Sequence, residues 1–281
     1  MSIIQEKYLI VNADDFGIDE EINRGIAECI GNGIVSSVSI VSNGTAFEEA
    51  LNLVNRNLDI GIGVHLCLVG ERSILPKEKI PSIVDEKGFL SKNYSHLLFK
   101  ICKNKVNLSE IKEELEAQII RVLDSGISPT HLDSHQYTHL IPPVFNIVVQ
   151  LVKKYNIKWV RYPNQNKYMQ FMPLRNYIKR LCLSFISDYQ LAVLRKNSIY
   201  YADVSYGIMT NGHLNEYIIR EFLEGLYSGL TDITCHPGYN PINRAYHAWG
   251  YQWGEETRAL KSGGLKDLVK KLNIKLVNYA I

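Results

Sequence analysis

The sequence predicts an α/β fold, namely a closed or nearly closed (β/α) barrel of mostly parallel strands, in a single domain covering residues 1–281. Short apolar runs alternate with amphipathic segments of helical periodicity along most of the chain, and such alternation is typical of parallel sheets. With 46% hydrophobic and 21% charged residues, the composition is that of a folded globular protein. A barrel accommodates this length in one domain, with an open doubly wound sheet as the alternative.

The first part of the chain begins with a strand and continues with two helix–strand pairs. The apolar run YLIV at 8–11 is the first expected strand, and it ends abruptly in polar residues. In 19–33 isoleucine recurs every four residues after an acidic first turn, which predicts a helix closed by glycine. The β-branched run at 34–41 predicts a second strand, 46–55 a second helix and 60–68 a third strand.

The rest of the chain repeats this pattern at longer intervals. Residues 109–125 are the clearest amphipathic helix, with apolar residues on one face and Gly126 at the end. Another helix is expected at 144–154. The later strands are expected at 130–132, 158–161, 233–235 and 275–277.

Two stretches interrupt the alternation, and we interpret them as insertions. The first, at about 70–105, contains several Pro and Gly residues and is expected to form a long loop or hairpin. The second, at about 164–206, is rich in basic and aromatic residues, especially up to residue 201. It is either a lid facing the substrate or a packed helix with a solvated basic face.

Charge, hydropathy and cysteine content exclude several classes of protein. Lys and Arg number 31 and Asp and Glu 29, so the chain lacks the positive excess of a nucleic-acid binder. No uncharged apolar run approaches the roughly 18 residues of a membrane span, and the first residues lack a signal-peptide pattern. The five cysteines are scattered without a CxxC pair, which disfavours disulfides and thiolate zinc sites. We therefore expect a cytoplasmic protein that binds neither nucleic acid nor membrane.

Aspartate and histidine residues lie at the ends of the expected strands. Asp14 and Asp15 follow the first strand, His65 lies near the end of another, and His236 follows 233–235. The segment 131–135 (HLDSH) supplies two histidines and an aspartate in one window. Because catalytic groups of parallel α/β folds project from the carboxyl ends of strands, one barrel mouth can hold all of them.

The window around His131, Asp133 and His135 is the most informative of these. In either an extended or a helical backbone, two imidazoles, or an imidazole and a carboxylate, can face one point. A carboxylate such as Asp133 can also fix the tautomer of a ligand histidine. Since no cysteine accompanies them, the expected ion is a divalent one with nitrogen and oxygen ligands: zinc, magnesium, manganese or cobalt.

The remaining candidates each allow an alternative. Asp14 and Asp15 either belong to a solvated turn or helix cap, or have separate catalytic roles. In the second case one carboxylate binds a metal and the other acts as base. His65 is either a core histidine or a ligand. His236, before a Pro-Gly turn, suits a general acid with a pKa near neutrality, or else a hydrogen-bonded turn residue.

Four ordered motifs resemble those of the YdjC-like carbohydrate deacetylases. They are LIVNADDFG at 9–17, GVHLCL at 63–68, PTHLDSHQYTHLIP at 129–142 and CHPGY at 235–239. The resemblance implies a distorted (β/α) barrel that hydrolyses N-acetyl groups of amino sugars, such as chitooligosaccharides, with one divalent metal ion. Magnesium is the first expectation, with zinc, cobalt and manganese as alternatives.

The resemblance also implies roles for individual residues. Asp15, His65 and His135 would bind the metal, Asp14 would be the base and His236 the acid. The residues expected to bind substrate or support the ligands are His131, which is also an alternative ligand, Asp133, His139 and Arg161. The chain departs from the family at Val69 and at Gln136-Tyr137, positions that would alter the substrate pocket.

Two other functions remain as rivals at this stage. A metal-dependent phosphoesterase of barrel fold uses similar Asp and His clusters, although no phosphate-binding loop is recognisable in the sequence. A non-catalytic module that binds sugar or nucleic acid through 155–201 would leave the histidines without a role. The expected partner is an acetylated amino sugar, and a homodimer through the insertions is a further expectation.

Overall fold

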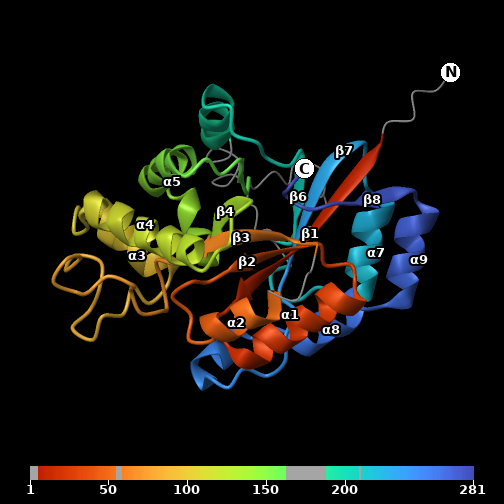
Figure 1. Cartoon of the computed structure of the whole chain (residues 1–281), viewed down its shortest axis with the longest axis horizontal. Coiled ribbons are helices and arrows are strands. Elements are labelled where there is room, and N and C mark those ends of the chain that lie inside the picture. Colours follow the sequence, from red (N-terminus) through yellow and green to blue (C-terminus); the bar gives the residue numbers. More distant parts are fainter. Residues whose placement is uncertain (1–5, 55–58, 163–187, 209) are drawn as a thin grey trace.

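The computed structural model describes residues 6–54, 59–162, 188–208 and 210–281, and its centre is a curled sheet of eight parallel strands (Figure 1). The strand order is β5-β4-β3-β2-β1-β7-β6, and β8 pairs with the beginning of β1. The strands are β1 Lys7–Phe16, β2 Ser37–Ile40, β3 Gly61–Leu66, β4 His131–Ser134, β5 Trp159–Val160, β6 Val204–Tyr206, β7 Gly229–Cys235 and β8 Ile274–Leu276.

Helices cover the outside of this sheet (Figure 1). The α-helices are α1 Glu20–Asn32, α2 Phe47–Val54, α3 Tyr94–Cys102, α4 Leu108–Asp124, α5 Pro142–Lys154, α7 Glu216–Glu224, α8 Trp253–Leu260 and α9 Gly263–Lys271. Among the described residues, η1 His135–Leu140 and η3 Arg244–Trp249 are 3₁₀ helices in the connecting segments. Residues 188–196 are also helical. Over the described residues, no helix combines the length and apolar character that a membrane crossing requires.

The predicted fold, a distorted parallel barrel in one unit, is confirmed. All named strand pairs are parallel. The two outer strands approach each other through one segment: Tyr200 bridges to Trp159 of β5, and β6 begins four residues later and pairs with β7. The sheet is therefore curled, so the carboxyl ends of its strands face a common region.

The two predicted insertions contain more regular structure than the sequence indicated. The hairpin expectation holds for Arg72 and Phe89, which form an antiparallel bridge. The first insertion also contains α3. This helix was not predicted, because the neighbouring Pro and Gly residues indicated a loop. The second insertion contains β6 at its end. Most of its basic aromatic part, 163–187, lies outside the described residues, so the lid interpretation stays a prediction.

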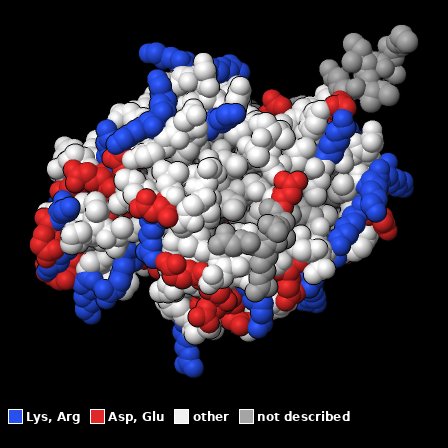
Figure 2. All heavy atoms as spheres, viewed as in Figure 1, with Lys and Arg blue, Asp and Glu red and all other residues white. Residues whose placement is uncertain are grey.

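Charged side chains lie mainly around the rim of the face in Figure 2, where positive and negative groups are interspersed. This distribution agrees with the net charge of +2.

Below the surface, the helices pack their apolar faces against the sheet. In α4, for example, Ile111, Leu115 and Ile119 are all fully buried, as the periodicity of 109–125 predicted.

Gly25 allows α1 to pack directly against the loop that follows β7. A Cβ atom at Gly25 would lie 2.4 Å from the Cα of Gly238, whereas one at Gly31 of the same helix would meet nothing within 4 Å. We expect Gly25→Ala to lower the free energy of unfolding by about 1–3 kcal/mol through overpacking. Gly31→Ala should leave it unchanged or raise it by up to about 1 kcal/mol, because Ala is the better helix former. Urea unfolding of both variants tests this, and equal stabilities would contradict it.

Candidate metal centre

A backbone irregularity places two consecutive aspartates on the same side of β1. Successive side chains of a regular strand point to opposite faces. In β1 the register with β2 shifts between Ala13 and Phe16, and Asp15 has a φ of 65°, a left-handed conformation that Asp tolerates better than most residues. Asp14 and Asp15 are consequently both buried, and both lie close to the imidazole of His65.

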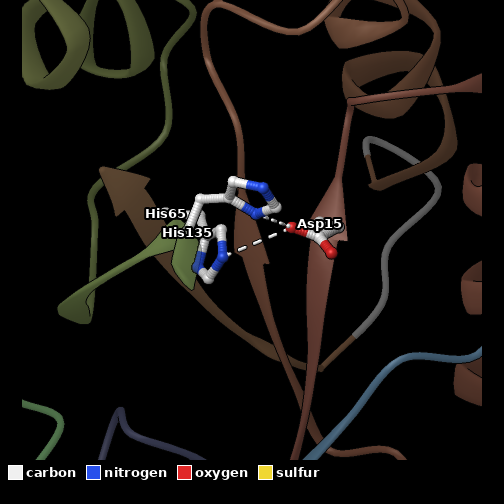
Figure 3. Close-up of side chains that lie close together, drawn as sticks. All are labelled: Asp15, His65 and His135. Carbon is white, nitrogen blue, oxygen red and sulfur yellow. Dashed lines mark hydrogen bonds and ion pairs between the residues drawn. The ribbon is translucent and has the colours of Figure 1, made fainter. Parts of the chain in front are cut away.

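Three side chains from separate elements converge on one point (Figure 3). Asp15 Oδ1 lies 2.7 Å from Nδ1 of His135, at the start of η1, and 3.4 Å from Nε2 of His65, on β3. The three ligand atoms lie within 4.8 Å of one another, and all three residues are buried. Two imidazole nitrogens and a carboxylate oxygen are donors that suit a divalent transition metal, so this set fits a metal ion.

The hydrogen bond between His65 and Asp133 favours this set over a second one. Asp14, His65 and Asp133 also bring ligand atoms within 4.8 Å of one another. However, Nδ1 of His65 lies 2.7 Å from Oδ1 of Asp133, so the Nδ1–H group donates to the carboxylate and Nε2 is the nitrogen left to act as a ligand. Nε2 lies 3.4 Å from Asp15, and a carboxylate on the other ring nitrogen is the arrangement that orients ligand histidines.

The guanidinium of Arg161 contacts the carboxylates of Asp14 and Asp133. Its NH1 and NH2 atoms contact the two carboxylate oxygens of Asp14 at 2.7 and 2.9 Å, and NH2 lies 2.9 Å from Asp133. Its Nε atom faces Asp232 at 3.6 Å. Burial disfavours the charged guanidinium, yet the carboxylates outweigh it and raise the pKa of Arg161 well above its usual value. Arg161 is 2% exposed, and its two contacts with Asp14 orient that carboxylate.

His236 and His65 lie on opposite sides of Asp14, because β7 and β3 lie on opposite sides of β1 in the sheet. His236 follows Cys235 of β7, which pairs in register with Ala13. Its backbone N–H donates to Oε2 of Glu256 at 2.5 Å, and its ring contacts the ring of Tyr251, with centroids 4.9 Å apart. Burial lowers the pKa of His236 despite the nearby carboxylates. Its Nδ1 atom is buried and has no hydrogen-bond partner within the described part of the chain.

His131 and His139 are not brought to this cluster. Nε2 of His131 lies 2.9 Å from Oγ of Ser39, a hydroxyl that also donates to Asp133 at 2.6 Å. His139 lies between Ser134 and the backbone oxygen of Arg161. Both imidazoles are fully buried, and burial lowers the pKa of His131 to about 3 and that of His139 to about 4. As neutral hydrogen-bonding groups, His131 contacts Ser39 beside Asp133 and His139 contacts the backbone of Arg161.

Several residues of the site were missed in the sequence, although strand alternation marks some of them. Polar side chains alternate with apolar ones inside the buried strands, which indicates a polar interior of the barrel. These residues are Asn12 before Asp14, Ser37 and Ser39 on β2, and Asp232 and Thr234 before His236. Glu256 had no such signal. It is fully buried on α8, where burial raises its pKa to about 8.

Proton loss from His65 links metal binding to pH. Burial disfavours the imidazolium, but the carboxylates of Asp133 and Asp14 outweigh it and raise the pKa of His65 from 6.5 to about 10 in the metal-free protein. A ligand histidine must be neutral, so metal binding should release this proton. We expect the apparent affinity to rise as the pH increases between 6.5 and about 10. The slope should be about tenfold per pH unit for one proton.

Isothermal titration calorimetry in buffers of different ionisation enthalpy measures this proton release. The same protonation stabilises the metal-free fold below pH 6.5, and this contribution is lost as the pH rises through about 10. Metal-free protein should therefore become less stable toward alkaline pH while metal affinity improves. An affinity that does not change with pH would contradict the assignment of His65 as a ligand.

Comparisons with known proteins agree with the fold and the motifs. The family described as YdjC-like protein matches residues 8–271. A carbohydrate deacetylase of Thermoanaerobacter pseudethanolicus is 29% identical over 279 residues, covering 98% of this chain and 99% of the relative. A carbohydrate deacetylase of Clostridium beijerinckii is 28% identical and covers 96% and 98%.

Solved structures resemble the chain over nearly its whole length. A putative cellobiose-phosphate cleavage protein of Enterococcus faecalis superposes with a TM-score of 0.77 at 27% identity, covering 98% of both chains. A lactam utilization protein of Thermus thermophilus, at 12% identity and a TM-score of 0.50, shares the fold alone.

Proposed function

Because the chain belongs to the YdjC-like family, we propose that it is a metal-dependent hydrolase that removes N-acetyl groups from amino sugars of the chitooligosaccharide type. The name carbohydrate deacetylase, carried by relatives aligned over almost the full length, supports this proposal. The observation that carries it is the convergence of Asp15, His65 and His135 beside two further side chains. These are an aspartate held by arginine and a histidine whose Nδ1 has no hydrogen-bond partner among the described residues.

The proposed cofactor is one divalent ion held by Asp15, His65 and His135. Such an ion lowers the pKa of water and polarises a carbonyl oxygen, which is the chemistry that amide hydrolysis needs. Magnesium is the expectation from the family, whereas two imidazoles in the donor set suit zinc, cobalt or manganese as well. The metal that supports activity in a metal-stripped preparation identifies the ion.

The side chains around this point supply the proton transfers. Asp14 accepts the proton of the attacking water on a carboxylate oxygen, while the two contacts from Arg161 orient that carboxylate. His236 donates a proton to the departing sugar nitrogen, because an amine leaves far more readily than its anion. The burial of all three side chains excludes bulk water and strengthens these interactions.

Release of acetate from N,N′-diacetylchitobiose by metal-stripped protein, with and without magnesium, zinc or cobalt, tests the proposal. We expect acetate release that depends on metal and no phosphate release from p-nitrophenyl phosphate under the same conditions. The reverse pattern would replace the deacetylase by a barrel phosphoesterase, whose Asp and His clusters are similar. Sugar binding without hydrolysis at any metal would favour a non-catalytic carbohydrate-binding protein.

A further inference from the structure

A pocket of about 350 Å³ opens beside His135, one of the three proposed metal ligands. Its volume lies at the small end of the range for ligand pockets, which suits one sugar ring. Three segments far apart in the sequence form it: the first insertion, the start of η1 and the region of η3. The residues that characterise its lining are Gly70, Asp85, Phe89, Lys92, Gln136 and Trp249.

The wall made by the first insertion is held in place by backbone pairing. Phe89 bridges to Arg72, whose guanidinium lies over the Phe89 ring at 4.8 Å from its centroid. The N–H of Leu90 donates to the carbonyl of Glu71 at 2.9 Å. This insertion is therefore a defined hairpin at the pocket, and it supplies one half-buried aromatic ring together with the exposed Asp85 and Lys92.

Gln136 links this wall to the metal centre. Its side-chain oxygen accepts the N–H of Tyr94 at the start of α3, at 3.0 Å. Gln136 itself follows His135 directly and has a φ of 52°, a strained conformation for a residue with a side chain. Such strain persists only where the surroundings hold it, and it is concentrated at functional sites. His135, the proposed metal ligand, and Gln136, which lines the pocket, therefore belong to the same constrained turn.

The opposite wall is aromatic. The ring of Trp249 lies 5.0 Å from the ring of His135 and 4.7 Å from that of Tyr246. Tyr246 in turn donates from its hydroxyl to Glu71 at 2.8 Å, which ties η3 to the first insertion. Trp249 is partly exposed while Tyr246 is buried, so Trp249 offers ring surface to the pocket and Tyr246 fixes its position.

We infer that this pocket binds the second sugar ring of an oligosaccharide whose acetylated ring lies at the metal centre, an inference that rests on the proposed function. The negative faces of aromatic rings attract the C–H groups on the apolar face of a pyranose. Asp85 Oδ1 already accepts the N–H groups of Lys87 and Phe89, so its other carboxylate oxygen is the acceptor for the sugar hydroxyl groups. Lys92 is the donor. A substrate that spans both sites gains binding energy that a monosaccharide lacks, so the pocket selects disaccharides or longer chains.

Filling the pocket from an exposed position tests this without disturbing the fold. Ala245 lines the pocket on η3, and Ala248 on the same short helix is exposed and outside the lining. In the metal-loaded enzyme, Ala245→Phe should raise KM for N,N′-diacetylchitobiose by about tenfold, a loss of about 1.4 kcal/mol of binding. Its kcat/KM for N-acetylglucosamine should stay unchanged, and Ala248→Phe should behave as wild type with both sugars.

Direct binding separates failure of this inference from failure of the proposed function. Calorimetric titration of each protein with N,N′-diacetylchitobiose reports the pocket whether or not acetate is released. Weaker binding to Ala245→Phe without acetate release from wild type would support the pocket and overturn the deacetylase. Acetate release from wild type with identical KM values and affinities in both variants would support the deacetylase and overturn the pocket.

Discussion

Asp15→Asn is expected to remove metal binding and acetate release together. The carboxylate of Asp15 is the group that both His135 and His65 face, at 2.7 and 3.4 Å, and an amide neither carries its charge nor ligates a divalent ion as well. We expect kcat/KM to fall by more than the roughly 10–100-fold that loss of a supporting residue causes. Metal content after dialysis and acetate release measure the two effects.

Asp267→Asn provides the matched control, since it makes the same change at an exposed position on α9. It should retain the metal and the activity of wild type. Full activity dependent on metal in Asp15→Asn would show that the ligand set is wrong. The second cluster, Asp14 with His65 and Asp133, would then be the candidate to examine.

Arg161→Met is expected to destabilise the fold and to abolish activity. Arg161 is a buried cation that contacts Asp14 and Asp133 directly and faces Asp232. Removing one partner of a buried ion pair leaves uncompensated charge, which costs about 3–5 kcal/mol of unfolding free energy. Urea unfolding measures the loss, and Arg161→Lys should recover part of the stability but little activity, because lysine cannot hold Asp14 bidentately.

The pH dependence of this loss provides an internal check. In the folded protein Arg161 and His65 hold the pKa of Asp133 far below its ordinary 3.8, against the effect of burial. The stability from this ionised carboxylate is present above pH 3.8 and is lost as the pH falls below it. The difference between wild type and Arg161→Met should therefore shrink in acid. A difference that does not change with pH, or a variant as stable as wild type, would contradict the role of Arg161.

Local sequence pattern was sufficient to predict the strands that carry the site, because buried apolar runs ending in Asp or His are a strong signal. It could not predict that Asp14 and Asp15 face the same imidazole, since that depends on a register shift in β1. It also grouped His131 with His135, although the turn after β4 sends only His135 toward Asp15. These arrangements are set by tertiary packing and have no short-range pattern.

Ion pairs between residues far apart in the chain could not be predicted from the sequence either. Arg161 appeared as a residue that binds substrate or supports ligands, and the structure places it beneath the site, between carboxylates from β1, β4 and β7. Glu256 was missed because a single glutamate on an amphipathic helix is normally solvated. Its partners, the N–H groups of His236 and Leu214, come from other elements.

Titration of metal-stripped protein with metal, followed by acetate release from N,N′-diacetylchitobiose, tests the central claim most directly. The account predicts that activity rises linearly and reaches a plateau at about one equivalent of metal per chain, as expected for one tight site. His135→Ala should show no activity at any ratio, because it removes one of the three ligands. Equal activity before and after metal addition, or full activity of His135→Ala at one equivalent, would contradict a metal centre at Asp15, His65 and His135.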